Sequence, residues 1–384
     1  MISNNPKKLL ILLGSIAFLA QGDNYAAAPL IISIAKDLNL SIPSAALSIT
    51  AYMLPFGIFT LFFGPLADRY GKATVLNIAS FCTAIFSILC AYSFDLISLC
   101  LLRAANGAFA AAVLPVAVSL VGDSFEDSKR QNALGAVIGM MFFGGAVSPG
   151  IGGIVSYYGS WRLLYLIYGV AELIVALIMI KSLERNPGVI PSLNFIEVYK
   201  KSFGNENLIK VVSILFFVGF SVFGSFMFSG NFIQETMGYN ILFVGALLSL
   251  FGLSTAIAGR KAGTLRQKVG NNLLIYAGII GGVSWGSMIL WKNPILMSLS
   301  LIGFGFAFII IQSTIIQTAQ QSMPNQRGTV MSLASFNMFI GGGIGTFVNG
   351  KILSLFGFIP IFLTASIIIF MAGLVISRNL KSRT

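Results

Sequence analysis

The sequence predicts an all-α membrane protein with twelve transmembrane helices in two pseudo-symmetric six-helix bundles. Three observations lead to this fold class. The chain of 384 residues is 56% hydrophobic and only 9% charged, whereas soluble domains carry about 25% charged residues. Apolar runs long enough to cross a bilayer as helices recur along the whole chain. The second half of the chain also repeats features of the first half.

Twelve apolar runs are predicted to span the membrane, and the longest polar stretch lies between the sixth and the seventh. The spans of the first half are expected at roughly 9–31, 43–63, 73–93, 96–120, 131–156 and 162–180. Those of the second half are expected at roughly 208–232, 240–259, 271–291, 294–319, 328–352 and 357–377. We therefore predict an N-terminal six-helix bundle at 1–180, a linker at 181–207 and a C-terminal six-helix bundle at 208–384.

The distribution of basic residues predicts the orientation. With twelve spans and the N-terminus inside, 19 of the 24 Lys and Arg residues fall on the cytoplasmic side and four fall outside. Basic residues collect in cytoplasmic loops, so both termini and the linker are expected in the cytoplasm. The same rule explains the net charge of +12 without a nucleic-acid partner. We predict a multi-pass protein of the cell (inner, or cytoplasmic) membrane.

The two halves repeat in the same orientation. Gly64-Pro65-Leu66 is echoed 199 residues later by Gly263-Thr264-Leu265, and Arg130 is echoed 197 residues later by Arg327. Two such halves are typical of one class of secondary transporter, in which the substrate binds between them near the midplane of the membrane.

A charged hairpin between the second and third spans carries the first of three motifs. It reads Gly64-x-Leu66-Ala67-Asp68-Arg69-x-Gly71-Lys72. The second motif, Arg103-x-x-Asn106-Gly107, lies in the fourth span, with Asn where the motif has Gln. The third motif lies in the fifth span and comprises Gly144, Ser148, Pro149, Gly152 and Gly153, with Ser148 in place of a glycine.

These motifs resemble those of the major facilitator superfamily, over essentially the whole chain. The third motif, together with the Trp161-Arg162 pair, resembles the drug/proton antiporter branch. The resemblance implies that Gly64, Asp68, Arg69, Gly71 and Lys72 form a gating loop on the cytoplasmic side. The repeat places Gln267 where Asp68 stands, so an acidic latch is expected in one half only.

Ionisable residues inside apolar spans mark functional sites in membrane proteins by default. Asp23 and Arg103 are predicted at similar depth in the outer half of the bilayer, because helices rise 1.5 Å per residue. The pKa of a carboxyl group, near 4 in water, is raised by burial and lowered by a nearby arginine. Alternating access would let Asp23 take a proton outside and lose it inside. The resemblance likewise implies proton-coupling roles for Asp23 and Arg103; the alternative is a purely structural cross-link.

Glu172 is the third ionisable residue inside a span, and it is a possible proton or charge site. The resemblance places its helix at the periphery of the bundle, so a functional and a structural role both stay open. Polar side chains of other spans are candidates for the wall of a substrate cavity. They are Asn24, Tyr25, Asn106, Gln234, Gln312, Gln317 and Asn337.

The chain is predicted to be a secondary active transporter that exports small organic or drug-like molecules in exchange for protons, by alternating access. The alternatives are uptake or facilitated transport of a nutrient such as a sugar, an amino acid or a metal chelate (siderophore), and a membrane receptor or enzyme without transport. The sequence contains no histidine, and its three cysteines lack metal-ligand spacing, so no metal site and no enzyme are expected. The partners predicted are a small-molecule substrate, protons and the lipid bilayer; a monomer and no cofactor are expected, with the proton gradient as the energy source.

Overall fold

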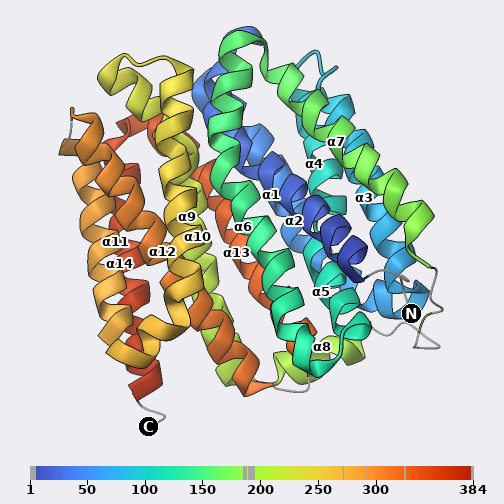
Figure 1. Ribbon diagram of the computed structural model, residues 1–384. Helices are drawn as coiled ribbons and strands as arrows, with labels where there is room; N and C mark the ends of the chain where they lie inside the picture. Colours follow the sequence, from blue (N-terminus) through green and yellow to red (C-terminus); the bar gives the residue numbers. More distant parts are fainter. Residues whose placement is uncertain are drawn as a thin grey trace.

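A computed structural model describes residues 6–184, 188, 195–270, 272–290, 292–323 and 326–381. Within these residues, twelve helices are long and apolar enough to cross a membrane, as the sequence predicts. Of the predicted linker, residues 185–187 and 189–194 lie outside the described part of the chain. Both chain ends lie in the lower half of the view, the side on which α8 lies (Figure 1).

Four of the six predicted spans of the first half form helices longer than the apolar run, whereas the third span forms a slightly shorter one. The fourth span is broken by a turn at Ala111 and Ala112, so it forms two helices, α4 and α5. The bounds are α1 (Pro6–Asp37), α2 (Ile42–Tyr70), α3 (Lys72–Cys90), α4 (Leu96–Ala110), α5 (Val113–Ser124), α6 (Asp127–Tyr158) and α7 (Trp161–Ser182).

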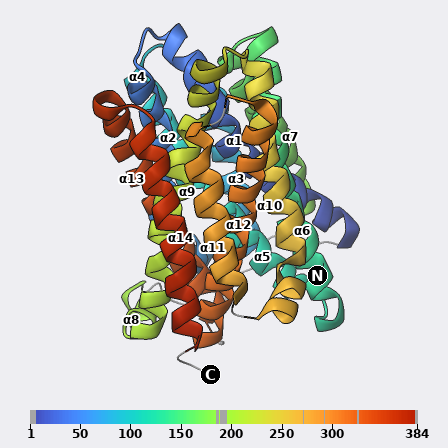
Figure 2. The same cartoon turned by 90° about the vertical axis from the view of Figure 1, so that its left-hand side faces the viewer.

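The second half follows a short helix, α8 (Phe195–Phe203), within the predicted linker. Figure 2 shows α11 and α14 of this half side by side in front of the other helices. The bounds are α9 (Glu206–Met237), α10 (Ile241–Val269), α11 (Asn272–Ser287) with a 3-10 turn η1 (Met288–Leu290), α12 (Pro294–Ser322), α13 (Arg327–Phe356) and α14 (Ile359–Lys381).

Polar caps set the starts of several helices. The side chains of Ser41, Asn205 and Asn240 each accept a hydrogen bond from a backbone N–H in the first turn of the next helix, which satisfies a donor that the helix leaves unpaired. Asp95 forms a reciprocal capping box with Ser98. Its hydrogen bonds with Ser98 hold the pKa of the Asp95 carboxyl below its usual range.

Two glycines related by the repeat end corresponding helices. Gly71 follows α2 with φ 94°, and Gly270 follows α10 with φ 65°, backbone angles that glycine adopts at no steric cost. The predicted hairpin at Gly64–Lys72 is therefore wrong in extent: α2 continues through Asp68 and Arg69 to Tyr70, and the turn is Gly71 alone. We call the end of the molecule that carries α8, Gly71 and Gly270 the linker end, and the opposite end the far end.

The two halves meet along three pairs of helices: α2 with α13, α6 with α10, and α1 with α9. The first pair is in contact along its whole length, from Pro43 beside Gly350 at the far end to Gly64 beside Ser332 at the linker end. The pair α6 and α10 is packed closely toward the far end, where the N–H of Gly150 donates to the hydroxyl of Ser249 at 2.9 Å. Near the linker end of α6, Gly135 and Gly139 face open space. The halves are therefore closed over the far end.

Pro65 inside α2 explains how α8 is held against the first half. Proline has no N–H, so the carbonyl of Leu61, one turn earlier, loses its helical partner. The phenol of Tyr199 on α8 donates to that carbonyl at 2.6 Å. Because α8 also packs against α9 and α13, this hydrogen bond adds a second link between α2 and the second half, beside the direct contact of α2 with α13.

Replacement of Tyr199 by Phe should lower the free energy of unfolding by about 1–3 kcal/mol, because the Leu61 carbonyl is left without a donor. The measurement is the unfolding midpoint of the purified protein in detergent. Tyr92→Phe is the matched control, since Tyr92 is exposed. Equal midpoints for the Tyr199 and Tyr92 variants would contradict the role of this hydrogen bond.

Candidate functional site

A buried ion pair joins α1 to α4. Nη1 of Arg103 donates to Oδ2 of Asp23 at 2.7 Å, and the two side chains are 0% and 2% exposed. Neither ion has access to water, so each depends on the other for its counter-charge. The structure thus brings together the two residues to which the sequence assigns a coupling role.

The arginine is fixed by groups from three further positions. Its Nη1 also donates to Oδ1 of Asn106 at 3.2 Å, and Nδ2 of Asn106 donates to the Thr83 carbonyl at 3.0 Å. The guanidinium carbon lies 4.2 Å from the ring centre of Tyr52 and 5.2 Å from that of Tyr165. Aromatic faces attract a cation, so they offset part of its lost hydration. Asn106, which stands where the second motif has Gln, therefore anchors Arg103 to the backbone of α3.

Two nitrogen atoms of Arg103, which carry three of its N–H donors, remain unused. Nε and Nη2 are buried and have no hydrogen-bond partner within the described part of the chain. A guanidinium carries five N–H donors in a fixed fork. The site therefore has capacity for a second acceptor.

Glu172 lies in the same buried region. Its side chain is 0% exposed, and among the described residues neither carboxyl oxygen has a hydrogen-bond partner. The charges of Asp23 and Arg103 both act on it. Although its helix was expected at the periphery, α7 faces α1 and α3 on this side, and Glu172 points into the bundle.

Ser148 is explained by its partner on α7. The hydroxyls of Ser148 and Tyr168 are 2.6 Å apart, and Ser148 also donates to the Gly144 carbonyl at 2.6 Å. Tyr168 is four residues before Glu172, which places both on one face of α7. Ser148, which stands where the family motif has glycine, thus belongs with the buried polar residues around Asp23, Arg103 and Glu172. We call this group the buried cluster.

The glycines of the third motif permit close packing of α6 on two sides. A Cβ on Gly144 would overlap the Phe18 carbonyl of α1, and a Cβ on Gly153 would lie 2.8 Å from the Ile241 carbonyl of α10. Small residues let helix backbones approach in this way. The motif therefore holds α6 between the helix that carries Asp23 and the second half.

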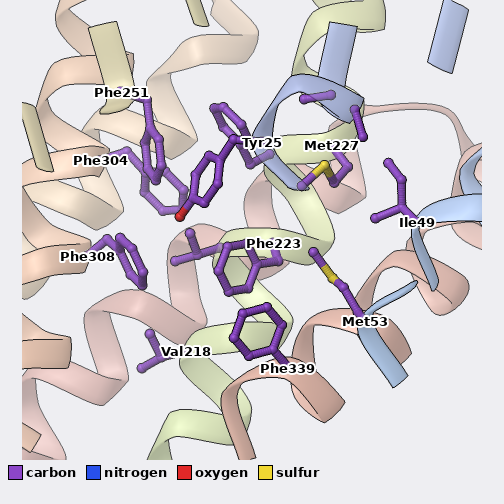
Figure 3. Packing of buried hydrophobic residues seen from close by; sticks show 14 of the residues in the cluster. Tyr25, Ile49, Met53, Val218, Phe223, Met227, Phe251, Phe304, Phe308 and Phe339 are labelled. Atoms are coloured by element: carbon purple, nitrogen blue, oxygen red, sulfur yellow. The ribbon is translucent and has the colours of Figure 1, made fainter. Parts of the chain in front are cut away.

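An aromatic cluster fills the junction between the halves, and Tyr25 of α1 is one of the residues that the first half adds to it (Figure 3). The Tyr25 ring centre lies 5.9 Å from that of Phe223 and 6.5 Å from that of Phe251. Phe56 of α2 stacks on Phe339 of α13 at 3.9 Å. Pairs of this kind add about 0.5–1.5 kcal/mol beyond burial. The wall between the halves is thus aromatic and apolar.

The seven polar residues predicted for a cavity separate into groups. Asn24, Tyr25 and Asn106 lie at the buried cluster or beside it. Gln312 on α12 donates to the sulfur of Met338 beside Asn337 on α13, in the second half. Gln317 accepts from Arg266, whose helix ends at the linker end, and Gln234 lies in the last turn of α9 at the far end. The structure does not bring these last two to the others.

Sequence reasoning missed the tyrosines of the cluster, namely Tyr52, Tyr165 and Tyr168. The spacing Tyr165, Tyr168 and Glu172 follows the 3.6-residue helical period. That period, applied to α7, would have shown three polar side chains on one face.

The predicted gating residues lie where α2 meets α3. Asp68 is exposed, and the charges of Lys72 and Asp123 act on it. Nζ of Lys72 pairs with Oδ2 of Asp123 at the end of α5, at 2.6 Å. Gly188 of the linker lies against the Arg69 carbonyl, and Gly64 faces Ser332 of α13. These contacts join the turn to the linker and to the second half.

Gly144→Ala should destabilise the protein by roughly 1–3 kcal/mol, because the new methyl group overlaps the Phe18 backbone. Gly139→Ala on the same helix is the matched control: nothing lies near its Cβ position, so this variant should be neutral or slightly stabilising. Unfolding midpoints in detergent measure both. A Gly144 variant as stable as the Gly139 variant would disprove the tight contact.

Comparisons with known proteins agree with this architecture. A model of the Major Facilitator Superfamily matches residues 13–346. An uncharacterized MFS-type transporter of Bacillus subtilis, YceJ, is 23% identical over 348 residues, which cover 88% of this chain and 87% of that protein. The MFS antiporter QDR3 of Candida albicans is 29% identical over 161 residues, 41% of this chain and 23% of that protein.

The fold of solved structures is similar as well. The crystal structure of a bacterial homolog to the human lysosomal transporter Spinster, in an inward-facing and unoccupied conformation, superimposes with a TM-score of 0.80 at 18% sequence identity, covering 97% of both chains. The structure of the nucleoside transporter NupG superimposes with a TM-score of 0.77 at 16% identity, covering 98% of this chain and 99% of that one. With twelve candidate spanning helices in the described residues and a family model that matches most of its length, the chain belongs to the Major Facilitator Superfamily of membrane transporters.

Proposed function

We propose that this transporter exports small organic molecules across the cytoplasmic membrane in exchange for protons. The observation that carries the proposal is the ion pair of Asp23 and Arg103. The pair is fully buried and joins α1 and α4 inside the first half. A buried ion pair is weak support for stability, whereas intramembrane carboxylates are typical of proton relays. Two further observations support proton exchange. The glycines of α6 resemble the family's antiporter motif, and QDR3, which matches 41% of this chain, is named as an antiporter.

The asymmetric contacts between the halves support alternating access. The far end is closed by α6 against α10 and by Tyr25 against α9, while the linker-end glycines Gly135 and Gly139 of α6 have no neighbour among the described residues. Rocking of one half against the other about α2 and α13 would open the far end and close the linker end. The charge distribution supports a cytoplasmic linker end and cytoplasmic termini.

The turn at Gly71 is the proposed gate of the linker end. Asp68 is the acid of this turn, and Gln267 occupies its place in the repeat. Only the first half therefore offers a carboxylate to the opposing helices. Asp68 is the residue through which the closed state would be stabilised.

Substrate class follows from the wall between the halves. Tyr25, Phe223, Phe251 and Phe339 present aromatic faces with few polar groups, which suits lipophilic organic molecules. We propose such compounds as cargo and a monomer as the transporting unit.

The test begins with a resistance screen of an overexpressing strain against toxic dyes and antibiotics, with ethidium first. Transport of the compounds to which the strain is resistant is then measured in proteoliposomes with an inward proton gradient, together with internal pH. Expulsion of the compound as protons enter is the expected result. Movement of compound and proton in the same direction would identify an importer and overturn the proposal.

Asp23→Asn should lower the rate of gradient-driven transport at least tenfold, while exchange of labelled for unlabelled compound continues. The Asn side chain neither binds a proton nor provides the counter-charge of Arg103. Glu206→Gln is the matched control, since Glu206 is exposed and far from the pair. A gradient-driven rate in the Asp23 variant equal to that of the control would remove Asp23 from the coupling mechanism.

A further inference from the structure

The buried cluster of the first half holds two carboxyl groups and one cation. Asp23 and Glu172 are the acids, Arg103 is the cation, and all three side chains are buried. An ionised carboxylate inside a membrane protein is strongly unfavourable unless a cation or several donors pair with it. The number of protons that the cluster retains therefore equals the number of its carboxyl groups minus the number of its cations.

The geometry shows which acid lacks the cation. Arg103 contacts Asp23 at 2.7 Å, while both oxygens of Glu172 have no hydrogen-bond partner among the described residues. We infer that Glu172 holds the proton of this cluster, and that Arg103 is shared between the two acids, binding Glu172 through Nε and Nη2 when that proton leaves. This rests on the proposed function only in taking that proton as the one exchanged.

The neighbours of Glu172 supply no second cation within the described part of the chain. Helices α1, α3 and α6 pack against α7. The titratable or charged groups that act on this cluster are Asp23 of α1, Tyr52 of α2, Cys90 of α3, Cys100 and Arg103 of α4, and Tyr165 and Tyr168 of α7. The side chain that α6 adds is Ser148, which does not titrate. Among the described residues, Arg103 is thus the one positive charge available to either acid.

The free N–H groups on Nε and Nη2 of Arg103 make it possible for the arginine to bind a second carboxylate. In the present state the proton lies on a carboxyl oxygen of Glu172, and the cluster carries no net charge. When the halves reorient and water reaches the site, the proton passes to water. The carboxylate that remains is then bound by Nε and Nη2, which are unused while Glu172 is protonated.

Infrared spectroscopy of the purified protein at neutral pH tests this assignment without any substrate. The wild type should show one carboxylic-acid C=O band from a buried group, and labelling with [13C]glutamate should shift it. Glu172→Gln should remove the band, since Asp23 keeps Arg103 as its counter-ion. Arg103→Gln should raise the signal to twice that of the wild type, because both acids then retain protons. Glu206→Gln should leave the band unchanged, since Glu206 is exposed.

Three results would each overturn the assignment: a band that persists in the Glu172→Gln variant, a band whose frequency does not shift on glutamate labelling, and the absence of a band in the wild type. Failure here is distinct from failure of the proposed function. The band can be present in a protein that shows no gradient-driven transport, and proton-driven transport can occur with the band absent.

Discussion

One buried cation organises the first half of this transporter. Arg103 lies at the meeting point of α1, α2, α4 and α7, with no access to water. Removal of its hydration must be balanced locally, and Asp23, Asn106 and the faces of Tyr52 and Tyr165 do so. A charged cluster of this kind restricts how the four helices can pack, because any shift that separates the ions leaves them unpaired.

The centre of the second half is apolar, whereas that of the first half is charged. Its centre is aromatic: Trp285 stacks on Phe304 at 4.0 Å, and Phe226 packs on Phe251 at 4.5 Å. Helix α1 connects the two environments. Asp23 and Tyr25 are two residues apart, about 200° around a helix, so one points to Arg103 while the other contacts Phe223 of α9. Movement of the halves therefore acts on the same helix that holds the ion pair.

The sequence predicts the fold well because apolar length is a direct consequence of bilayer thickness. It also predicts the pairing of Asp23 with Arg103, since depth along a helix follows from its rise per residue. It does not predict that Asp68 and Arg69 are helical, because Pro65 suggests a turn unless Tyr199 is known to bind the carbonyl that proline frees. Gln234 lies two residues beyond the predicted span 208–232, and Gln317 lies two residues before the end of the span 294–319. The same rise per residue therefore places both near a membrane surface, away from the other polar candidates. The burial of Glu172 depends on which face α7 turns inward, and this is decided by packing between helices.

One arginine serves two carboxyl groups in the proposed cluster. The direct measurement of this sharing is the free energy of unfolding in detergent for Asp23→Asn, Glu172→Gln and the double variant. Each single variant leaves Arg103 one carboxylate, so each loss should be small, whereas the double variant leaves a buried cation unpaired and should lose about 3–5 kcal/mol beyond the sum. Adding Arg103→Gln to the double variant should restore most of that loss. Additive losses, within about 0.5 kcal/mol, would contradict the shared counter-ion.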